Sequence, residues 1–264
     1  MIFILGALVG IIMALTGAGG GILAVPLLVF WLHLSVAQAA PLALLSVGIA
    51  AAVGAGIGLR TGAVRYRAAL WIGAVGIVLA PLGVWLSHRL HGSLMHVLFG
   101  VILLAVAYRT YVKAREVDAD NATPKTKRPV CLCDGETHRF IWTQRCTAVL
   151  ALIGAVAGLL SGLLGVGGGF VIIPALQRTT DLAMESIVPT SLAVIALVSL
   201  AGVVSSVGNG ALDISLAIRF TAGSAAGMIA GRLVASRLAG AVLQRGFALV
   251  CVVVAIGMIA RGVG

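Results

Sequence analysis

Residues 16–28 read TGAGGGILAVPLL and residues 164–176 read LGVGGGFVIIPAL, and these two stretches decide the fold. Each contains the pattern GxGGG followed, after four residues, by a proline, and each stands inside a long apolar run. In a helix interior a glycine costs about 1 kcal/mol relative to alanine, and a proline about 3 kcal/mol. The sequence therefore predicts that a helix is interrupted at both places.

The apolar run around the first copy, residues 2–32, is too long for one simple membrane crossing. A straight helix of this length would measure about 46 Å at a rise of 1.5 Å per residue, whereas the hydrocarbon layer is about 30 Å thick. Two half-helices joined by a glycine turn account for both the length and the break. They form either a re-entrant hairpin or one discontinuous span.

Further apolar runs follow along the chain and indicate an all-α polytopic membrane protein. Of its 264 residues, 61% are hydrophobic and 10% are charged, against about 25% charged residues in a soluble domain. The alternation of period two that a membrane β-barrel requires is absent, and the N-terminus lacks the basic residues of a cleavable signal peptide. The apolar runs cover residues 2–32, 36–59, 68–87, 93–111, 146–177, 187–207, 214–236 and 243–260.

The chain consists of two copies of one unit, related by a constant offset of 148 residues. Gly17 thus matches Gly165, and Pro26 matches Pro174, with no gap needed between residues 6 and 90. Each copy holds about four apolar segments, the first of them broken at GxGGG. The predicted organisation is a first membrane repeat (1–111), a polar central loop (112–145) and a second membrane repeat (146–264).

Basic residues favour opposite orientations for the two repeats. Residues 60–67 and the central loop are rich in arginine and lysine, which predicts a cytoplasmic location in the cell inner membrane. The equivalent of residues 60–67 in the second half, residues 208–213, holds only Asp213 as a charged group. The basic loop of that half is a different one, around Arg237 and Arg245. Inverted repeats explain this if each contains three full spans and a re-entrant hairpin. Four true spans per repeat would make the repeats parallel instead.

The glycine motifs are the candidate binding site. Glycine lets backbone N–H groups come close to a ligand, and the N-terminus of the following half-helix favours negative charge. Two such turns brought together would bind a small anion without a buried lysine, although glycines in membrane helices often serve only close packing. A P-loop or Rossmann motif is excluded, because apolar residues follow the glycines where those motifs need Gly-Lys-Ser/Thr or a strand. The candidate residues are Gly17, Gly19, Gly20, Gly21, Gly165, Gly167, Gly168 and Gly169, with Pro26, Pro41, Pro174 and Pro189 as hinge positions.

Polar side chains inside the apolar segments are further candidates for substrate binding. The hydroxyl-bearing candidates are Thr16, Ser46, Thr190 and Ser191, although hydroxyls in helices commonly bond their own backbone. Arg232 stands in an apolar run and either faces a cavity or extends to the interface. No aspartate or glutamate occurs in the first 115 residues. A carboxylate suited to proton or sodium coupling is therefore missing.

Other classes of function fit the sequence less well, and one stays open. The basic residues that give the net charge of +10 stand at the ends of apolar runs. This placement argues against nucleic-acid binding. An intramembrane serine enzyme would need a histidine near Ser161, and no histidine follows His138. No enzyme activity, cofactor or metal is therefore expected. A membrane protein that binds its ligand without moving it stays open, as does the oligomeric state.

The cysteines are predicted to be free thiols. They are too few and too unevenly spaced for a disulfide framework, and a cytoplasmic loop keeps thiols reduced. A metal site made of Cys131, Cys133, His138 and Cys146 is the alternative, although its spacing matches no standard site.

The doubled GxGGG-x4-P motif and the turn Asn209-Gly210-Ala211 resemble the TauE/SafE sulfite exporter family, also known as the 4-toluenesulfonate uptake permease family. The resemblance covers essentially the whole chain except residues 112–145. It implies a transporter of sulfite, sulfonates or related organic anions, with the bilayer and the anion as its partners. An anion of charge −2 leaving a cell 100 mV negative inside gains roughly 4–5 kcal/mol. Export therefore needs no coupling ion, whereas the alternative, uptake of organic acids, would need protons or sodium.

Overall fold

The computed structural model describes all residues except 91, 119–130, 132–142, 208–213, 239–240 and 264. The regular elements of the described residues are helical, which confirms the prediction of an all-α protein. They are α1 (Ile2–Thr16), the 3-10 helix η1 (Gly17–Leu23), α2 (Ala24–Leu32), α3 (Val36–Arg60), α4 (Tyr66–Arg89), α5 (Gly92–Asp118), α6 (Gln144–Leu164), α7 (Gly169–Thr179), α8 (Met184–Val207), α9 (Ile214–Leu238) and α10 (Ala241–Val263).

Six helices in the described part of the chain are long and apolar enough to cross a membrane: α3, α4, α5, α6, α8 and α10. The helices α1 and α2 are shorter, and α9 has 25 residues. The helix boundaries follow the apolar runs of the sequence closely. The exception is α5, which continues to Asp118 and so extends beyond residue 112, where the sequence predicts the start of the polar loop.

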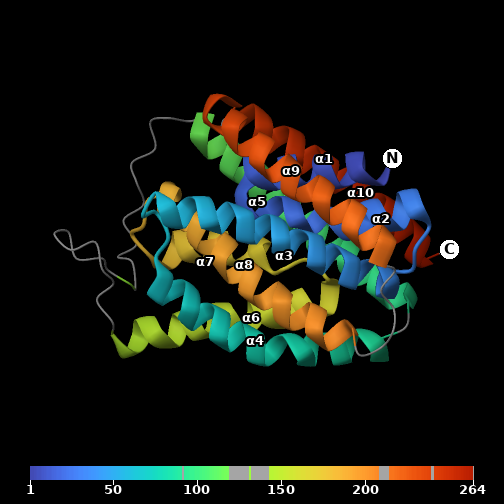
Figure 1. The fold of residues 1–264 in the computed structure, drawn as a ribbon, viewed down its shortest axis with the longest axis horizontal. Coiled ribbons are helices and arrows are strands. Elements are labelled where there is room, and N and C mark those ends of the chain that lie inside the picture. The colour runs from blue at the N-terminus through green and yellow to red at the C-terminus, as the bar shows by residue number, and fades with distance from the viewer. Residues whose placement is uncertain (91, 119–130, 132–142, 208–213, 239–240, 264) are drawn as a thin grey trace.

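The helices run between two ends of the molecule (Figure 1). At the end that we call the terminal end lie both chain termini, the start of α3 and the start of α9. At the opposite end, which we call the basic end, α3 leads into α4, and α6, α8 and α10 begin. Helix α1 starts at the terminal end and α2 returns to it, whereas α6 starts at the basic end and α7 returns to it.

Except for α2 and α7, each α-helix packs mainly against a helix of the other half. The principal pairs are α1 with α9, α6 with α4, α3 with α8 and α5 with α10. A Cβ atom at Gly10 of α1 would collide with the carbonyl oxygen of Ser224 in α9, and one at Gly158 of α6 with that of Gly76 in α4. Gly10 matches Gly158 and Gly76 matches Ser224 at the 148-residue offset. Matched positions thus make matched contacts, and small residues let the backbones approach closely, as in other membrane helix pairs.

Local sequence explains how the first hairpin connects to α3. His33 ends α2 in the left-handed conformation, with a φ of 53°. Ser35 then starts α3 with a capping box, because its hydroxyl accepts from Gln38 N (3.3 Å) while its own N–H donates to Gln38 Oε1 (3.2 Å). Such a box satisfies two N–H groups that a helix start leaves without partners.

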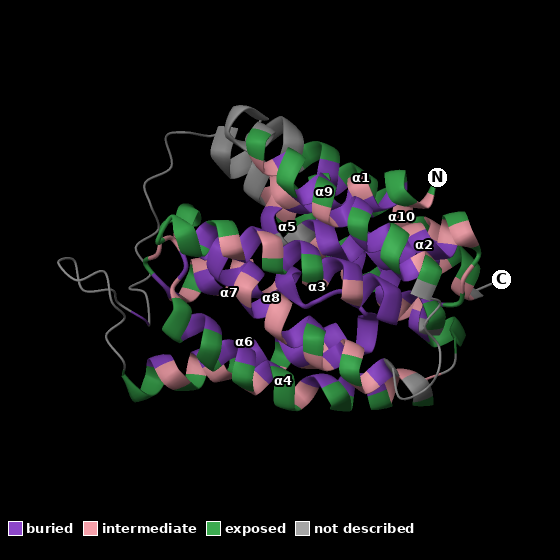
Figure 2. Ribbon diagram, viewed as in Figure 1, coloured by how far each residue is buried: buried purple, intermediate pink, exposed green. Residues whose placement is uncertain are grey.

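Burial separates central from peripheral helices. Buried residues are most frequent on α3 and α8, which lie in the middle, while α4, α5 and α10 expose one side (Figure 2). Their exposed residues include large apolar side chains such as Leu82, Val101, Leu249 and Ile256. An apolar outer surface of this kind fits a bilayer, whose hydrocarbon is as apolar as leucine.

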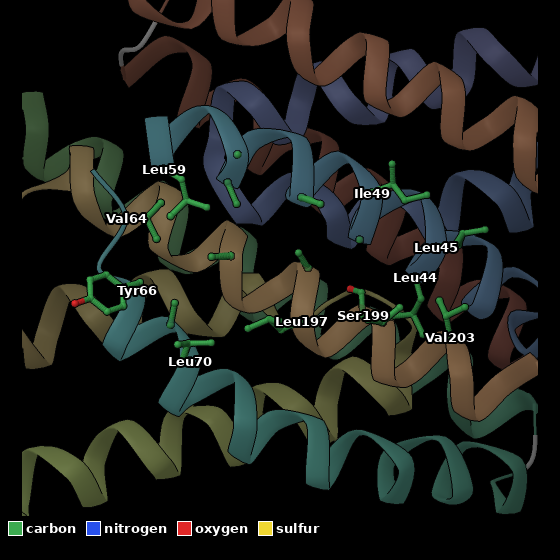
Figure 3. Close-up of a pocket in the computed structure, with 18 residues that line it drawn as sticks. Leu44, Leu45, Ile49, Leu59, Val64, Tyr66, Leu70, Leu197, Ser199 and Val203 are labelled. Atoms are coloured by element: carbon green, nitrogen blue, oxygen red, sulfur yellow. The ribbon is translucent and has the colours of Figure 1, made fainter. Parts of the chain in front are cut away.

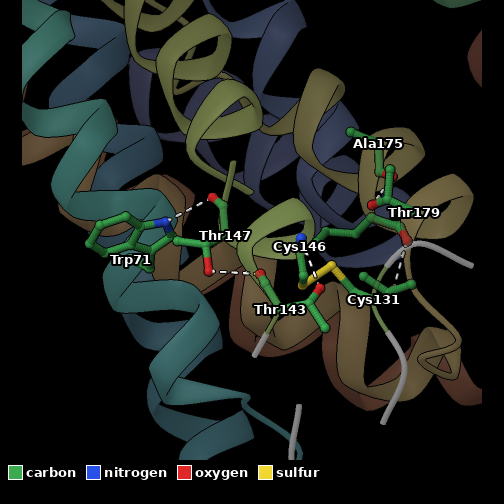
Figure 4. The surroundings of a disulfide bond; sticks show 9 residues. Trp71, Cys131, Thr143, Cys146, Thr147, Ala175 and Thr179 are labelled. Carbon is green, nitrogen blue, oxygen red and sulfur yellow. Dashed lines mark hydrogen bonds between the residues drawn. A yellow bond between two sulfur atoms is a disulfide. The ribbon is translucent and has the colours of Figure 1, made fainter. Parts of the chain in front are cut away.

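The prediction of free thiols is wrong for two cysteines. Cys131 and Cys146 form a disulfide, with a Cα–Cα distance of 5.1 Å (Figure 4). Cys131 N donates to Thr179 O (2.9 Å), so the end of α7 holds the residue beside the start of α6. The spacing along the sequence does not reveal this proximity, since it depends on α7 folding back along α6. The pairing also removes both thiols from the alternative metal site, while Cys133 and His138 lie outside the described residues.

Candidate functional site

The first glycine motif forms a short helix of its own. Helix α1 ends at Thr16, Gly17 takes a φ of +76°, and the 3-10 helix η1 leads into α2. A Cβ atom at Gly20 would collide with the backbone of Met13, so this segment folds back tightly on α1. Ala18 and Gly19 also belong to η1.

The second glycine motif takes a different, more open form. Helix α6 ends at Leu164, and Gly165, Gly167 and Gly168 all have positive φ, at 72°, 77° and 68°. Residues with a side chain rarely adopt this conformation. Residues 165–168 therefore form a turn with three left-handed glycines between α6 and α7, where the first repeat has a 3-10 helix.

The two motifs lie against each other inside the molecule. A Cβ atom at Gly21 would lie 3.2 Å from Val166 O, in the middle of the second turn. The Val47 side chain of α3 would lie 3.1 Å from a Cβ at Gly21 and 3.2 Å from one at Gly167, so it contacts both motifs. The structure therefore brings together the two stretches on which the sequence prediction rests.

Backbone amides at the second turn are suited to an anion. The first amides of α7 that find a backbone acceptor are those of Val171 and Ile172, which both donate to Gly168 O. Within the described residues, the amides of Gly169 and Phe170 precede them without such an acceptor, as expected at a helix start. The positive end of the α7 dipole lies at the same place.

The four hydroxyl candidates from the sequence all donate to their own helix. Their acceptors are Ile12 O for Thr16 (2.7 Å), Ala43 O for Ser46 (3.0 Å), Ser186 O for Thr190 (2.6 Å) and Val188 O for Ser191 (2.7 Å). Thr190 Oγ1 also accepts from Arg65 N (3.0 Å), which ties the α3–α4 connection to α8. These hydroxyls have the local partners that mid-helix serines and threonines usually find.

Three buried hydroxyls outside the candidate set, those of Ser161, Ser199 and Thr221, have no hydrogen-bond partner in the described residues. Ser199, on α8, lies 3.1 Å from the position of a Cβ at Gly167, so its hydroxyl adjoins the second turn. Ser161 lies on the last turn of α6, and its carbonyl oxygen accepts from Gly165 N (2.9 Å). Since buried polar groups are nearly always hydrogen-bonded, the hydroxyls of Ser199 and Ser161 are the ones best placed to donate to a ligand at the second turn.

Arg232 donates a hydrogen bond to the backbone of α3 rather than to a glycine motif. Its guanidinium donates to Gly54 O of α3 (3.0 Å), and the residue is half-buried near the basic end of α9. This bond joins α9 to α3. Whether the arginine also binds substrate stays a prediction.

Three of the four hinge prolines lie inside helices, whereas Pro26 stands in the first turn of α2. Each of the three interior prolines removes one N–H donor from its helix, so the nearby backbone is weaker there. Pro26 lies in α2, Pro41 in α3, Pro174 in α7 and Pro189 in α8.

A cavity of about 230 Å³ is lined by residues from the starts of α3 and α5 and the ends of α4, α6 and α8. Its walls include Gly162 and Leu163, which directly precede the turn, and Pro41 of α3. The cavity is partly polar, because Ser35, Ser87, His96 and Ser206 also line it. Because Gly162 and Leu163 line it, the cavity comes close to the second glycine turn, at the end of α6.

Comparison with known proteins gives consistent matches over most of the chain. A profile of the family described as "Sulfite exporter TauE/SafE" matches residues 2–258. A "Probable membrane transporter protein" of Xylella fastidiosa is 28% identical over 265 residues, which cover 97% of this chain and 93% of that protein. Another of Methanocaldococcus jannaschii is 28% identical over 211 residues, covering 78% of this chain and 71% of that protein. One of Bacillus subtilis is 22% identical over 231 residues, covering 85% and 84%. No solved structure matches the chain.

Proposed function

Because this chain belongs to the sulfite exporter TauE/SafE family of membrane transporters, we propose that it carries small sulfur-containing anions, such as sulfite or organosulfonates, out of the cell. The substrate lies between the two glycine motifs, and the second turn supplies most of its contacts. No covalent step takes part.

The observation that carries this proposal is the Ser199 hydroxyl beside Gly167. The hydroxyl is buried, has no partner among the described residues and adjoins a turn of three left-handed glycines. Hydroxyl and amide donors with a helix N-terminus form an anion site that requires no buried cation. Discontinuous helices present their N-termini to anionic substrates in other carriers.

We propose further that the two repeats are inverted. The matched helices α3 and α8 run in opposite directions, and the α1–α2 and α6–α7 pairs enter from opposite ends (Figure 1). Each pair is then a re-entrant hairpin, and the two meet at the substrate. A site enclosed by two opposed hairpins can be reached from either end in turn, which is how inverted-repeat carriers alternate.

The distribution of arginine supports a cytoplasmic basic end in the inner membrane, together with the 112–145 loop. The terminal end, where Arg89 ends α4 and Arg261 lies in the last turn of α10, is then periplasmic. The basic end carries Arg60, Arg65, Arg67, Arg109, Arg145, Arg178, Arg237 and Arg245.

The test is sulfite flux from proteoliposomes made with Ser199→Ala. Removal of an unpaired hydroxyl leaves the fold intact but takes one donor from the anion, so the half-saturating sulfite concentration should rise about tenfold. Ser205→Ala is the matched control, since this serine lies on the same helix and donates to Ala201 O (2.8 Å).

Equal flux in both variants would remove Ser199 from the site. Absence of sulfite and sulfonate flux in the unaltered protein would refute the proposed substrate class. Binding of these anions without any flux would instead support a protein that binds its ligand and does not move it.

A further inference from the structure

An apolar groove of about 530 Å³ lies between α3, α8 and the start of α4 (Figure 3). Its volume falls within the range of about 300–1,000 Å³ typical of ligand pockets. Among the described residues that line it, the only polar side chains are the hydroxyls of Ser199 and Tyr66. The smaller cavity near the second glycine turn, by contrast, has a partly polar lining.

The groove extends far along the membrane-spanning helices. Leu45 and Val203 line one end, and Leu59, Val64 and Tyr66 line the other (Figure 3). From Leu45 to Leu59 helix α3 rises about 21 Å at 1.5 Å per residue, which is more than half of a hydrocarbon layer about 30 Å thick. In a bilayer such a groove is filled by hydrocarbon, because carbon-lined walls offer water no hydrogen bonds.

The groove ends at the basic end of the molecule beside an arginine with an unmet donor. Arg65 follows Val64 and precedes Tyr66, both of which line the groove. Its Nε is buried and has no hydrogen-bond partner within the described residues, while its backbone N–H donates to Thr190 Oγ1 (3.0 Å) and fixes it on α8. A buried unpaired donor costs about 1–3 kcal/mol. A rotation of the side chain that brings Nε to an acceptor outside the chain would remove this cost.

A phosphate group is the acceptor that suits this position. Guanidinium groups bind phosphate through paired, charge-assisted hydrogen bonds. Arg60 and Arg67 flank the same connection and are exposed. Asp181 and Glu185 lie at this end, before and at the start of α8, so the three arginines still leave a surplus of positive charge. Tyrosines such as Tyr66 commonly lie at the level of lipid headgroups.

We propose that the groove binds one anionic glycerophospholipid, with an acyl chain between α3 and α8 and the phosphate at Arg65. A second copy of the chain fits this surface less well. Two copies related by an axis along the bilayer normal would place their basic ends at the same level, so that like charges would face each other. The groove also reaches Ser199, and the bound chain therefore lies behind the proposed substrate site.

Native mass spectrometry of protein released from phosphatidylethanolamine–phosphatidylglycerol vesicles into mild detergent tests this proposal. The unaltered protein should retain one phosphatidylglycerol. Gly56→Phe should retain none, because a Cβ at Gly56 meets nothing within 4 Å and the ring can enter the groove freely. Gly246→Phe is the matched control, since Gly246 lies in a helix, is equally open and does not line the groove.

Arg65→Gln tests the headgroup contact apart from the groove, and it decides the matter if Gly56→Phe fails to fold. We expect about a tenfold loss of retained phosphatidylglycerol, as for the loss of one charge-assisted hydrogen bond. Arg89→Gln, at the other end of α4, should change nothing. Unchanged lipid retention in Gly56→Phe or in Arg65→Gln would overturn the proposal. A shift from dimer to monomer in Gly56→Phe, with lipid retention unchanged, would show that a second copy occupies the groove.

Discussion

Gly167 has a φ of +77°, and a Cβ atom there would lie 2.7 Å from Ile195 Cγ2 and 3.1 Å from Ser199 Oγ. Gly62 has a φ of +68° in the α3–α4 connection, and a Cβ atom there would meet nothing within 4 Å. The two glycines therefore share the backbone conformation and differ in packing. This pair can separate the two reasons for glycine at the second turn.

We expect Gly167→Ala to destabilise the protein more than Gly62→Ala and also to abolish sulfite flux. In both variants the left-handed backbone conformation costs the alanine about 1–2 kcal/mol. Only Gly167→Ala also makes the new Cβ overlap with Ile195 and displaces Ser199. Thermal unfolding in detergent and flux from proteoliposomes measure the two effects. Equal unfolding temperatures and equal flux in the two variants would show that the second turn is not packed as described.

At this scale the sequence predicts the site in part. The glycines are predictable because a doubled GxGGG motif is hard to reconcile with an uninterrupted apolar helix, and the structure brings the two copies together at Gly21 and Val166. The hydroxyls are not predictable, because a serine that bonds its own helix and one without a partner look alike in sequence. Ser46 and Ser199 differ only in which neighbours surround them.

The elements themselves are predicted well by hydropathy, since a helix that must cross lipid is marked by its length of apolar sequence. Their partners are not. Nothing in the order of segments says that α1 packs against α9 rather than α3. The disulfide is missed for the same reason, because it depends on α7 returning to the start of α6.

The disulfide should hold the start of α6 to the segment around Cys131. It closes a loop with a sequence separation of 15 residues, which in the chain-entropy model contributes about 3 kcal/mol. Both cysteines are fully buried, and thiol exchange requires access to a sulfur. We therefore expect the disulfide to persist even at a cytoplasmic end. Cys146→Ser should lower the unfolding temperature in detergent, whereas Cys251→Ser, which removes a buried free thiol, should leave it less changed.

Peptide mapping after rapid acid quenching and alkylation of whole cells measures the state of these cysteines directly. A linked peptide containing Cys131 and Cys146 is the expected result. Complete alkylation of both before any reductant is added would mean that the disulfide does not form in the cell.

For the whole molecule, the proposed inversion of the repeats predicts that equivalent positions face opposite sides of the membrane. Ser35 and Ala183 are equivalent at the 148-residue offset, are both exposed, and directly precede α3 and α8. In a background without the native cysteines, Ser35→Cys should react with an impermeant maleimide added to intact spheroplasts. Ala183→Cys should react only after permeabilisation. Reaction of both under the same condition would mean that the repeats are parallel.

The charge distribution of the whole molecule leads to a prediction about energy coupling. Among the described membrane helices, acidic residues lie only near helix ends, as Glu185 does in the first turn of α8. A carrier without a carboxylate at its centre has no group there to load a proton or sodium ion together with the anion. The membrane potential is then the main driving force, at about 2.3 kcal/mol per charge for each 100 mV.

We expect sulfite to leave proteoliposomes faster when a potassium gradient with valinomycin makes the interior negative, roughly in proportion to the imposed potential. A pH or sodium gradient at zero potential should have no effect beyond changing the ratio of sulfite to bisulfite, for which vesicles without protein are the control. Flux that requires a proton or sodium gradient and ignores the potential would instead establish a coupled carrier.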